Sequence, residues 1–104
     1  MTTAKSVKLT ATAENGQVFT RKTARAYLYA VYVETTYSDG EVSNSKPSWA
    51  SRPDLAAKSL DRLHEYAASK QGKEVLLWDM QKGGWIHTGR FYAKVRAIAV
   101  PVNG

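Results

Sequence analysis

The stretch ARAYLYAVYVETTY, residues 24–37, decides the fold of this chain. Tyrosine, valine and threonine dominate it, and their side chains suit the pleated, partly buried surface of a β-sheet. Alternate residues of a strand point to opposite faces, and here both faces are partly apolar, with Val31 on one face and Leu28 and Tyr32 on the other. We therefore predict that residues 24–37 form the longest strand of the chain and lie centrally in the sheet.

A hairpin is predicted on each side of this strand. Upstream, apolar and polar residues alternate over 7–14, which is the period of a half-buried strand, and Asn15-Gly16 then returns the chain through residues 17–20. Downstream, Asp39-Gly40 returns the chain through residues 41–43. Asn-Gly and Asp-Gly are the strongest short hairpin signals, because a type I′ turn needs a positive φ at both central residues.

One helix is predicted over residues 52–71. Ser51 and Asp54 have the spacing of a capping box, and Pro53 suits the first turn, where its missing N–H costs nothing. Gly72 suits the end of the helix. The apolar side chains that recur at helical spacing, and that should face the sheet, are Ala56, Leu60, Leu63 and Ala67.

The C-terminal third is predicted to be β-structure. The predicted pieces are a strand at residues 73–80, a turn at Gly83-Gly84, a short segment at 85–88, a break at Gly89 and a final strand at 90–100. Within the first piece, the apolar run 75–78 is expected to be buried on both faces, with Trp78 in the core. Residues 43–53, ahead of the helix, are predicted to form a loop.

These elements predict an α+β fold, with an antiparallel or mixed β-sheet of about five to six strands and one helix packed on one face. The length of 104 residues is typical of a single domain. We therefore expect one domain over residues 1–104, with frayed ends at 1–6 and 101–104.

The composition excludes some classes of protein and favours others. The chain has no cysteine, which excludes disulfides and thiolate metal sites and fits a reducing compartment. It has no apolar run long enough for a transmembrane helix, and residues 1–10 lack the apolar segment of a secretory signal. We therefore expect no membrane association and a cytoplasmic location. The net charge of +6 is typical of proteins that bind polyanions or acidic partners.

The sequence shows no group of residues that is typical of an enzyme. A cysteine nucleophile, a Gly-x-Ser-x-Gly motif and the glycine-rich phosphate and dinucleotide motifs are all missing. His64 and His87 have no carboxylates at the spacing of a zinc site. Gly83-Gly84 fits a hairpin turn better than an anion-binding turn, because no helix follows it. We therefore expect a non-catalytic protein without a metal or cofactor.

Basic and aromatic residues give the best candidate for a binding surface. Three positive charges come directly before the tyrosine-rich strand, and alternation places one tyrosine and two basic residues on one face of the final strand. If the two strands are neighbours with matched faces, these residues form one surface that holds phosphates by charge and stacks bases on aromatic rings. Ordinary cross-strand packing explains the same pattern without a function. The candidate partner-binding residues are Arg21, Lys22, Arg25, Tyr27, Tyr29, Trp85, Tyr92, Lys94 and Arg96.

The tryptophans have different expected places. Trp85 follows two glycines and is the candidate for an exposed aromatic anchor, a kind of residue that dominates many protein interfaces. Trp49 lies before the helix and is expected to pack against its first turn.

Two stretches carry a resemblance to a known group of proteins. They are TRKTARAYLYAVYV, residues 20–33, and SWASRPDLAAK, residues 48–58. These stretches resemble small uncharacterised accessory proteins of bacteriophages. The resemblance implies expression in a bacterial cytoplasm and action on a host component. Its motifs are a strand and a helix entry, and it transfers no functional residue to this sequence.

Two functions follow from these features. The first is a small binding module for an acidic host protein, through a basic and aromatic surface. The second is a nucleic-acid-binding domain that uses the tyrosine-rich face of the sheet. A homodimer through an exposed edge strand is a further expectation.

Overall fold

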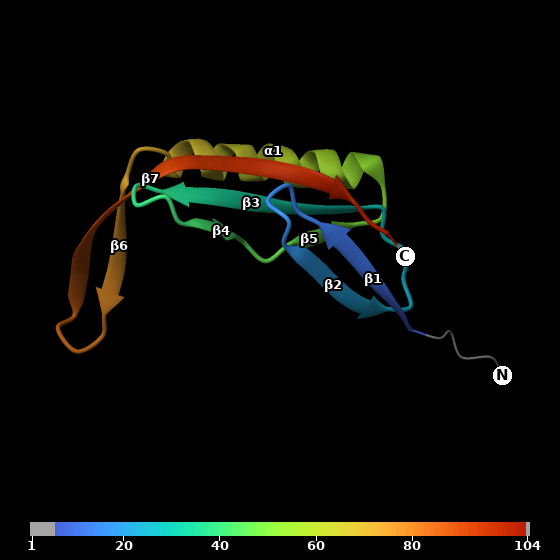
Figure 1. Ribbon diagram of the computed structural model, residues 1–104, viewed down its shortest axis with the longest axis horizontal. Coiled ribbons are helices and arrows are strands. Elements are labelled where there is room, and N and C mark those ends of the chain that lie inside the picture. The colour runs from blue at the N-terminus through green and yellow to red at the C-terminus, as the bar shows by residue number, and fades with distance from the viewer. Residues whose placement is uncertain (1–5, 104) are drawn as a thin grey trace.

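The computed structural model describes residues 6–103 and confirms the α+β fold. Its elements follow in the order β1 (Val7–Thr12), β2 (Val18–Thr23), β3 (Tyr29–Tyr37), β4 (Val42–Asn44), β5 (Ser48–Ala50), α1 (Pro53–Lys70), β6 (Glu74–Asp79) and β7 (Gly84–Pro101). The molecule is elongated, with extents of 56 × 29 × 24 Å, and α1 runs along the central sheet (Figure 1).

The strands form two antiparallel sheets rather than one. The central sheet has the order β4-β3-β7-β6, with β5 also paired to β3, and β1 and β2 form a separate two-stranded sheet. The central sheet has five strands, which agrees with the predicted five to six, and the described residues hold seven strands in all. The missed strand is β5, because it has three residues and lies in a proline-containing stretch that resembles a loop.

The central position predicted for the tyrosine-rich strand is confirmed, although β3 begins at Tyr29 and not at residue 24. It pairs with β7 along its whole length, for example Tyr32 with Ile98. The strand begins late because the Thr23 hydroxyl accepts a hydrogen bond from the backbone N–H of Arg25 at 3.1 Å. This local turn ends β2 and leaves residues 24–28 as the connection between the two sheets.

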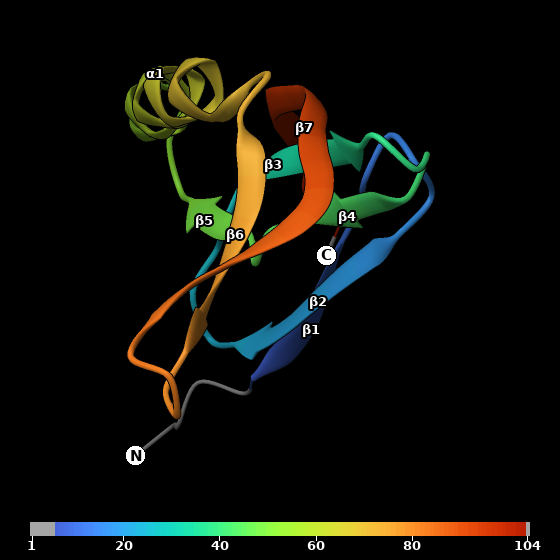
Figure 2. The same cartoon turned by 90° about the vertical axis from the view of Figure 1, so that its left-hand side faces the viewer.

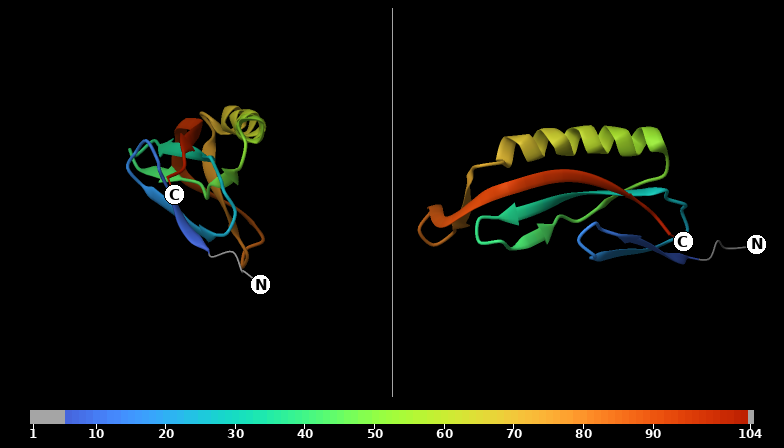
Figure 3. Two further views of the ribbon diagram at one scale, coloured as in Figure 1. Left: turned by 90° about the vertical axis from the view of Figure 1, so that its right-hand side faces the viewer. Right: turned by 45° about the horizontal axis from the view of Figure 1, so that its top comes forward.

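The core has two layers, one on each face of the central sheet. The helix covers one face, where Ala56 packs with Val31 and Ala67 packs with Val33 and Val95. The β1–β2 hairpin covers the other face (Figures 2 and 3). Its buried cluster consists of Ala11, Ala13, Phe19, Ala30, Tyr32, Ile98 and Val100. The predicted helix on one face is therefore confirmed, and the hairpin is the second cover.

Both predicted hairpin turns form, but not with type I′ geometry. Among the described residues, positive φ values occur only at glycines, including Gly16 at 94° and Gly40 at 89°. Asn15 and Asp39 therefore lack the positive φ that a type I′ turn requires. In each turn the glycine N–H donates to the carbonyl three residues earlier, as Gly16 does to Ala13 at 2.9 Å. This is the three-residue hairpin with a glycine bulge.

The helix has the predicted extent but a different N-terminus. Arg52 is the N-cap, without a side-chain capping hydrogen bond, and Pro53 opens the first turn. The predicted capping box of Ser51 and Asp54 is therefore wrong. Gly72 follows the helix with a φ of 81°, a conformation that suits glycine, and its N–H donates to the Tyr92 carbonyl at 2.7 Å.

A polar network joins the β1–β2 hairpin to the centre of the sheet. The Tyr32 hydroxyl accepts a hydrogen bond from the backbone N–H of Glu14 at 3.0 Å. Arg96 donates to the nearly buried Glu34 carboxylate at 3.0 Å, and Asn15 Nδ2 lies 3.3 Å from the same carboxylate. Burial raises the pKa of Tyr32, and the hydrogen bond to Glu34 raises the pKa of Arg96.

The C-terminal segments also differ from the predictions. Residues 84–101 form one continuous strand, in place of a short segment and a separate strand, because Gly89 with a φ of 74° takes part in the strand and does not end it. Residues 101–103 are held rather than frayed, since the backbones of Thr10 and Asn103 exchange hydrogen bonds of 2.9 and 2.7 Å. Residues 1–5 and 104 lie outside the described residues. No helix within residues 6–103 is long and apolar enough to cross a membrane.

Candidate functional site

The strongest candidate site is an arm that projects from one end of the molecule. We use the name arm for residues 74–91, which comprise β6, the connecting turn and the first part of β7. Figures 1 and 3 show this hairpin bending away from the end of the central sheet, beyond the last turn of α1. No residue from 74 to 94 is buried, so the arm packs against the rest of the chain only at its base.

Large apolar side chains gather on the arm. The described part of the chain has twelve large apolar residues that are exposed, and seven of them belong to the arm. They are Leu76, Leu77, Trp78, Met80, Trp85, Ile86 and Phe91, with exposures from 40% to 86%. The prediction that the run 75–78 is buried on both faces, with Trp78 in the core, is therefore wrong. No other element of the described chain covers this hairpin.

Both faces of the arm carry apolar side chains. In an antiparallel pair, directly opposed residues share a face. Trp78 opposes Trp85 and Leu76 opposes His87 on one face, whereas Leu77 opposes Ile86 on the other. The rings of Trp78 and Trp85 meet edge to face, with centroids 5.2 Å apart. The predicted exposure of Trp85 is confirmed, and its role as an anchor stays a prediction.

A small pocket lies where the arm meets the end of α1. Its volume is about 280 Å³, and it is lined by Lys70, Lys73, Glu74, Leu76, Trp85 and Tyr92. The one carboxylate in this lining is already engaged, because Glu74 contacts His87 Nδ1 at 2.7 Å and accepts from the Gly89 N–H at 3.3 Å. The hydrogen bond with His87 lowers the pKa of Glu74. The pocket therefore combines aromatic walls with two lysines.

The structure separates the residues that were predicted to form one basic and aromatic surface. The strands β3 and β7 are neighbours, as that prediction required, but the register shifts between Thr36 and Tyr37. Tyr92 therefore pairs with Tyr37 and packs on the helix side, whereas Arg96 points to the other face and pairs with Glu34. The predicted shared face of Tyr92, Lys94 and Arg96 is wrong, because the bulge at residue 93 reverses the alternation.

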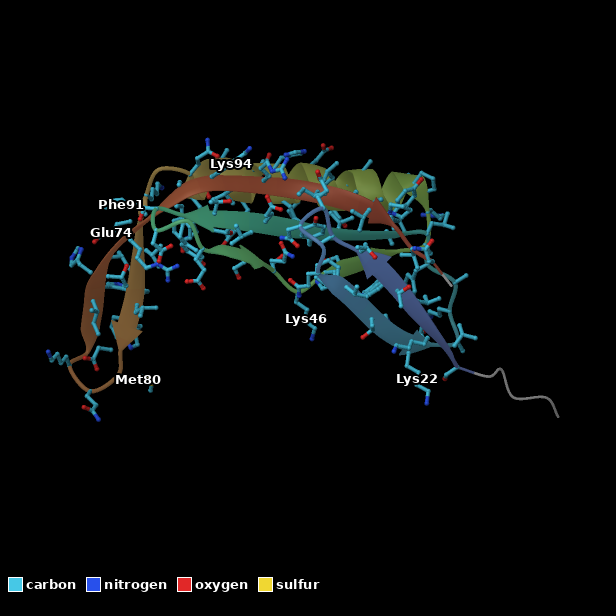
Figure 4. The ribbon with its side chains drawn as sticks, viewed as in Figure 1. Lys22, Lys46, Glu74, Met80, Phe91 and Lys94 are labelled. Carbon is cyan, nitrogen blue, oxygen red and sulfur yellow. The ribbon has the colours of Figure 1, made fainter. Side chains whose placement is uncertain are left out.

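The remaining predicted residues lie at the opposite end of the molecule. Figure 4 shows Lys22 at that end, far from Met80 at the tip of the arm and from Lys94 on β7. The Arg21 guanidinium lies over the Tyr27 ring, 4.9 Å from its centroid. Tyr29 packs on the helix side of the sheet, and Arg25 is exposed in the connection after β2. The predicted set thus divides into an N-terminal basic cluster and an aromatic group near the arm.

The other singled-out side chains occupy structural places. Trp49 packs against the cluster under the β1–β2 hairpin, with its ring 6.3 Å from that of Tyr27, and not against the first turn of the helix as predicted. The side chain faces that way because Trp49 pairs with Ala30. His64 is exposed on α1. Residues 6–103 contain no group of three or more side chains placed to hold a metal ion.

Sequence reasoning missed six residues of the arm: Leu76, Leu77, Trp78, Met80, Ile86 and Phe91. One signal was available, because the chain has a single predicted helix and its apolar stripe is already used by the central sheet. If β6 and the first part of β7 were also buried, another helix or sheet would have to pack over them, and the sequence predicts none. Comparison of the chain with protein-family models, curated proteins and solved structures gave no match.

Proposed function

We propose that this protein is a small, non-catalytic binding module that holds a protein partner on its arm. The observation that carries the proposal is the exposure of seven large apolar side chains on one projecting hairpin. Exposed apolar surface gathered in one place is typical of protein-binding sites, and tryptophans are enriched among residues that dominate binding energy. An isolated two-stranded hairpin is marginally stable in water, so a partner that covers both faces would also stabilise the arm.

The charges around the arm favour an acidic partner. Lys70 and Lys73 line the pocket, and Lys82 lies in the connecting turn between β6 and β7. None of the three pairs with a carboxylate among residues 6–103. The arm's two carboxylates are occupied, Glu74 by His87 and Asp79 by the N–H groups of the turn. Complementary charge on a partner increases the association rate and selects among partners.

The resemblance to phage accessory proteins indicates in which compartment, and on what kind of partner, this binding module acts. We infer that it acts in a bacterial cytoplasm on an acidic host protein. The absence of cysteine suits a reducing compartment.

Replacing Trp85 by Ala tests this proposal. The tagged full chain should capture a specific protein from a nuclease-treated bacterial lysate, and Trp85→Ala should reduce the captured amount by about tenfold or more, because one buried aromatic anchor contributes about 2 kcal/mol. Quantitative mass spectrometry of the captured proteins gives the readout. Leu28→Ala is the matched control, because Leu28 is also a large exposed apolar residue, at 50%, but lies in the connection between β2 and β3, away from the arm. Equal capture by wild type and Trp85→Ala would disprove the proposed site.

A second function has one specific observation in its favour. Lys8 and Lys22 stand directly opposite each other on the exposed face of the β1–β2 hairpin, although opposed like charges destabilise a strand pair. Neither lysine pairs with a carboxylate within residues 6–103. A polyanion such as single-stranded nucleic acid would relieve this repulsion.

A salt titration with random-sequence single-stranded RNA tests the second function. Lys22→Ala should weaken binding to all sequences similarly and reduce the slope of log K against log salt by about 0.7, the contribution of one phosphate contact on a single strand. Fluorescence anisotropy measures the slope, and Lys58→Ala on α1 is the control. An absence of binding at low salt would remove this function and leave the arm proposal unaffected.

A further inference from the structure

The outer edge of β6 is open. The strand pairs with β7 on one side, and no strand within residues 6–103 pairs with it on the other (Figure 2). Natural edge strands are usually blunted by lysine, proline or a bulge. In β6 the register shift lies before Leu76, and the regular part that follows, residues 76–79, contains neither lysine nor proline. Such an edge is a template for a strand from another chain.

The pocket is next to β6, because Glu74 and Leu76 of this strand line it, together with Lys73 directly before the strand. Leu76 of β6 and Trp85 of β7 both line it, and Glu74 marks the base of the arm (Figure 4). A strand added along β6 points alternate side chains to one face of the sheet. Some of those side chains would therefore lie on the same face as Leu76, next to the pocket.

The charges of the lining decide what kind of strand fits. Lys73 comes directly before β6, and Lys70 is in the last turn of α1. Glu74, the one carboxylate of the lining, is hydrogen-bonded to His87. An incoming basic strand would meet like charge, whereas an acidic strand would meet two ammonium groups that have no carboxylate partner among residues 6–103.

We propose that the arm binds its partner by strand addition, with an extended acidic segment of the partner pairing along β6. An apolar side chain of that segment packs beside Leu76 at the pocket, and carboxylates two positions away, on the same face of the strand, contact Lys70 and Lys73. This inference rests on the proposed function, because it names the chemistry of the partner at the same arm. The fold needs no rearrangement, since the open edge and the pocket already exist.

Two pools of synthetic peptides test the inference on the isotope-labelled full chain. One pool has ten-residue peptides with Val, Ile or Phe at a central position and Asp or Glu two positions before and after it, and the other has Lys or Arg in place of the acids. The acidic pool should shift the backbone amide resonances of residues 73–79 and slow their hydrogen exchange. Lys73→Glu should weaken its binding by about tenfold, because the substitution exchanges attraction for repulsion. Lys58→Glu, an equal charge change on the exposed face of α1, should leave binding unchanged.

The outcomes separate this inference from the proposal on which it rests. If Trp85→Ala abolishes capture of the protein partner but neither pool shifts residues 73–79, strand addition is overturned and the binding site stands. Equal binding of both pools would overturn the acidic chemistry. Concentration-dependent shifts of the same resonances without peptide, with dimers seen in sedimentation, would assign the edge to a second copy of this chain and overturn the proposed occupant.

Discussion

Replacing Tyr32 by Ala should lower the free energy of unfolding by about 4 kcal/mol, the largest effect we expect from a single substitution. Tyr32 is fully buried at the centre of β3, where its ring packs 5.1 Å from that of Phe19. Truncation would leave a cavity between the sheet and the β1–β2 hairpin, and it would leave the Glu14 N–H without its acceptor. Chemical denaturation followed by circular dichroism measures the change.

Tyr32→Phe is the matched control, because it keeps the ring and removes only the hydroxyl. It should cost about 1 kcal/mol near neutral pH, the usual worth of one hydrogen bond. Burial raises the pKa of Tyr32 above 10.0, so the folded state favours the neutral phenol. That contribution is fully present below about pH 10 and is lost as the pH rises through the raised pKa. Tyr32→Phe should therefore flatten the alkaline loss of stability, and an unchanged profile would contradict this assignment.

Removal of the arm should abolish capture of the protein partner while the fold is kept. In this variant residues 75–90 are replaced by Asn-Gly, which joins Glu74 to Phe91, two residues that already oppose each other. No residue from 74 to 94 is buried, but the deletion removes the ion pairs of Arg90 with Asp39 and Glu41, so we expect the free energy of unfolding to fall by about 1 to 2 kcal/mol. Binding should fall below detection, because six of the seven exposed apolar side chains of the arm are removed and only Phe91 remains.

The control for this deletion is a variant that loses exposed apolar surface elsewhere. Val18→Ser on β2 changes a side chain that is 54% exposed, and it should retain full capture. Thermal melts and lysate capture are measured for both variants. A shortened chain that still captures the partner would move the site away from the arm, and one that fails to fold would show that the arm stabilises the core.

The parts of the fold that depend on local pattern could be predicted from the sequence. Strand alternation over 7–14 and the helical spacing from Ala56 to Ala67 each place apolar side chains on one side of their element. In the structure these side chains pack on opposite faces of the central sheet. The central position of β3 also followed from its two apolar faces. In these segments the local preference and the tertiary packing agree, which is why the patterns were sufficient.

The candidate site could not be predicted in the same way, because it consists of apolar side chains that no other part of the described chain packs against. The sequence of an apolar run such as 75–78 does not show whether the run packs against its own chain or against a partner. The reversal of Tyr92 depends on a bulge, and a one-residue shift moves every later side chain to the opposite face. The pair of Arg96 and Glu34 joins residues 62 positions apart, a separation that charge counting along the chain does not detect.

The continuous course of β7 has a mechanical consequence. This strand begins in the arm and continues along β3, with which it pairs from Tyr92 to Pro101. A pull on the arm is therefore transmitted along one covalent strand and loads the whole ladder of hydrogen bonds with β3 in shear, instead of opening them one by one. The backbone of the arm is thus continuous with the strand that pairs with β3, and a force that a bound partner exerts on the arm acts directly on the central sheet.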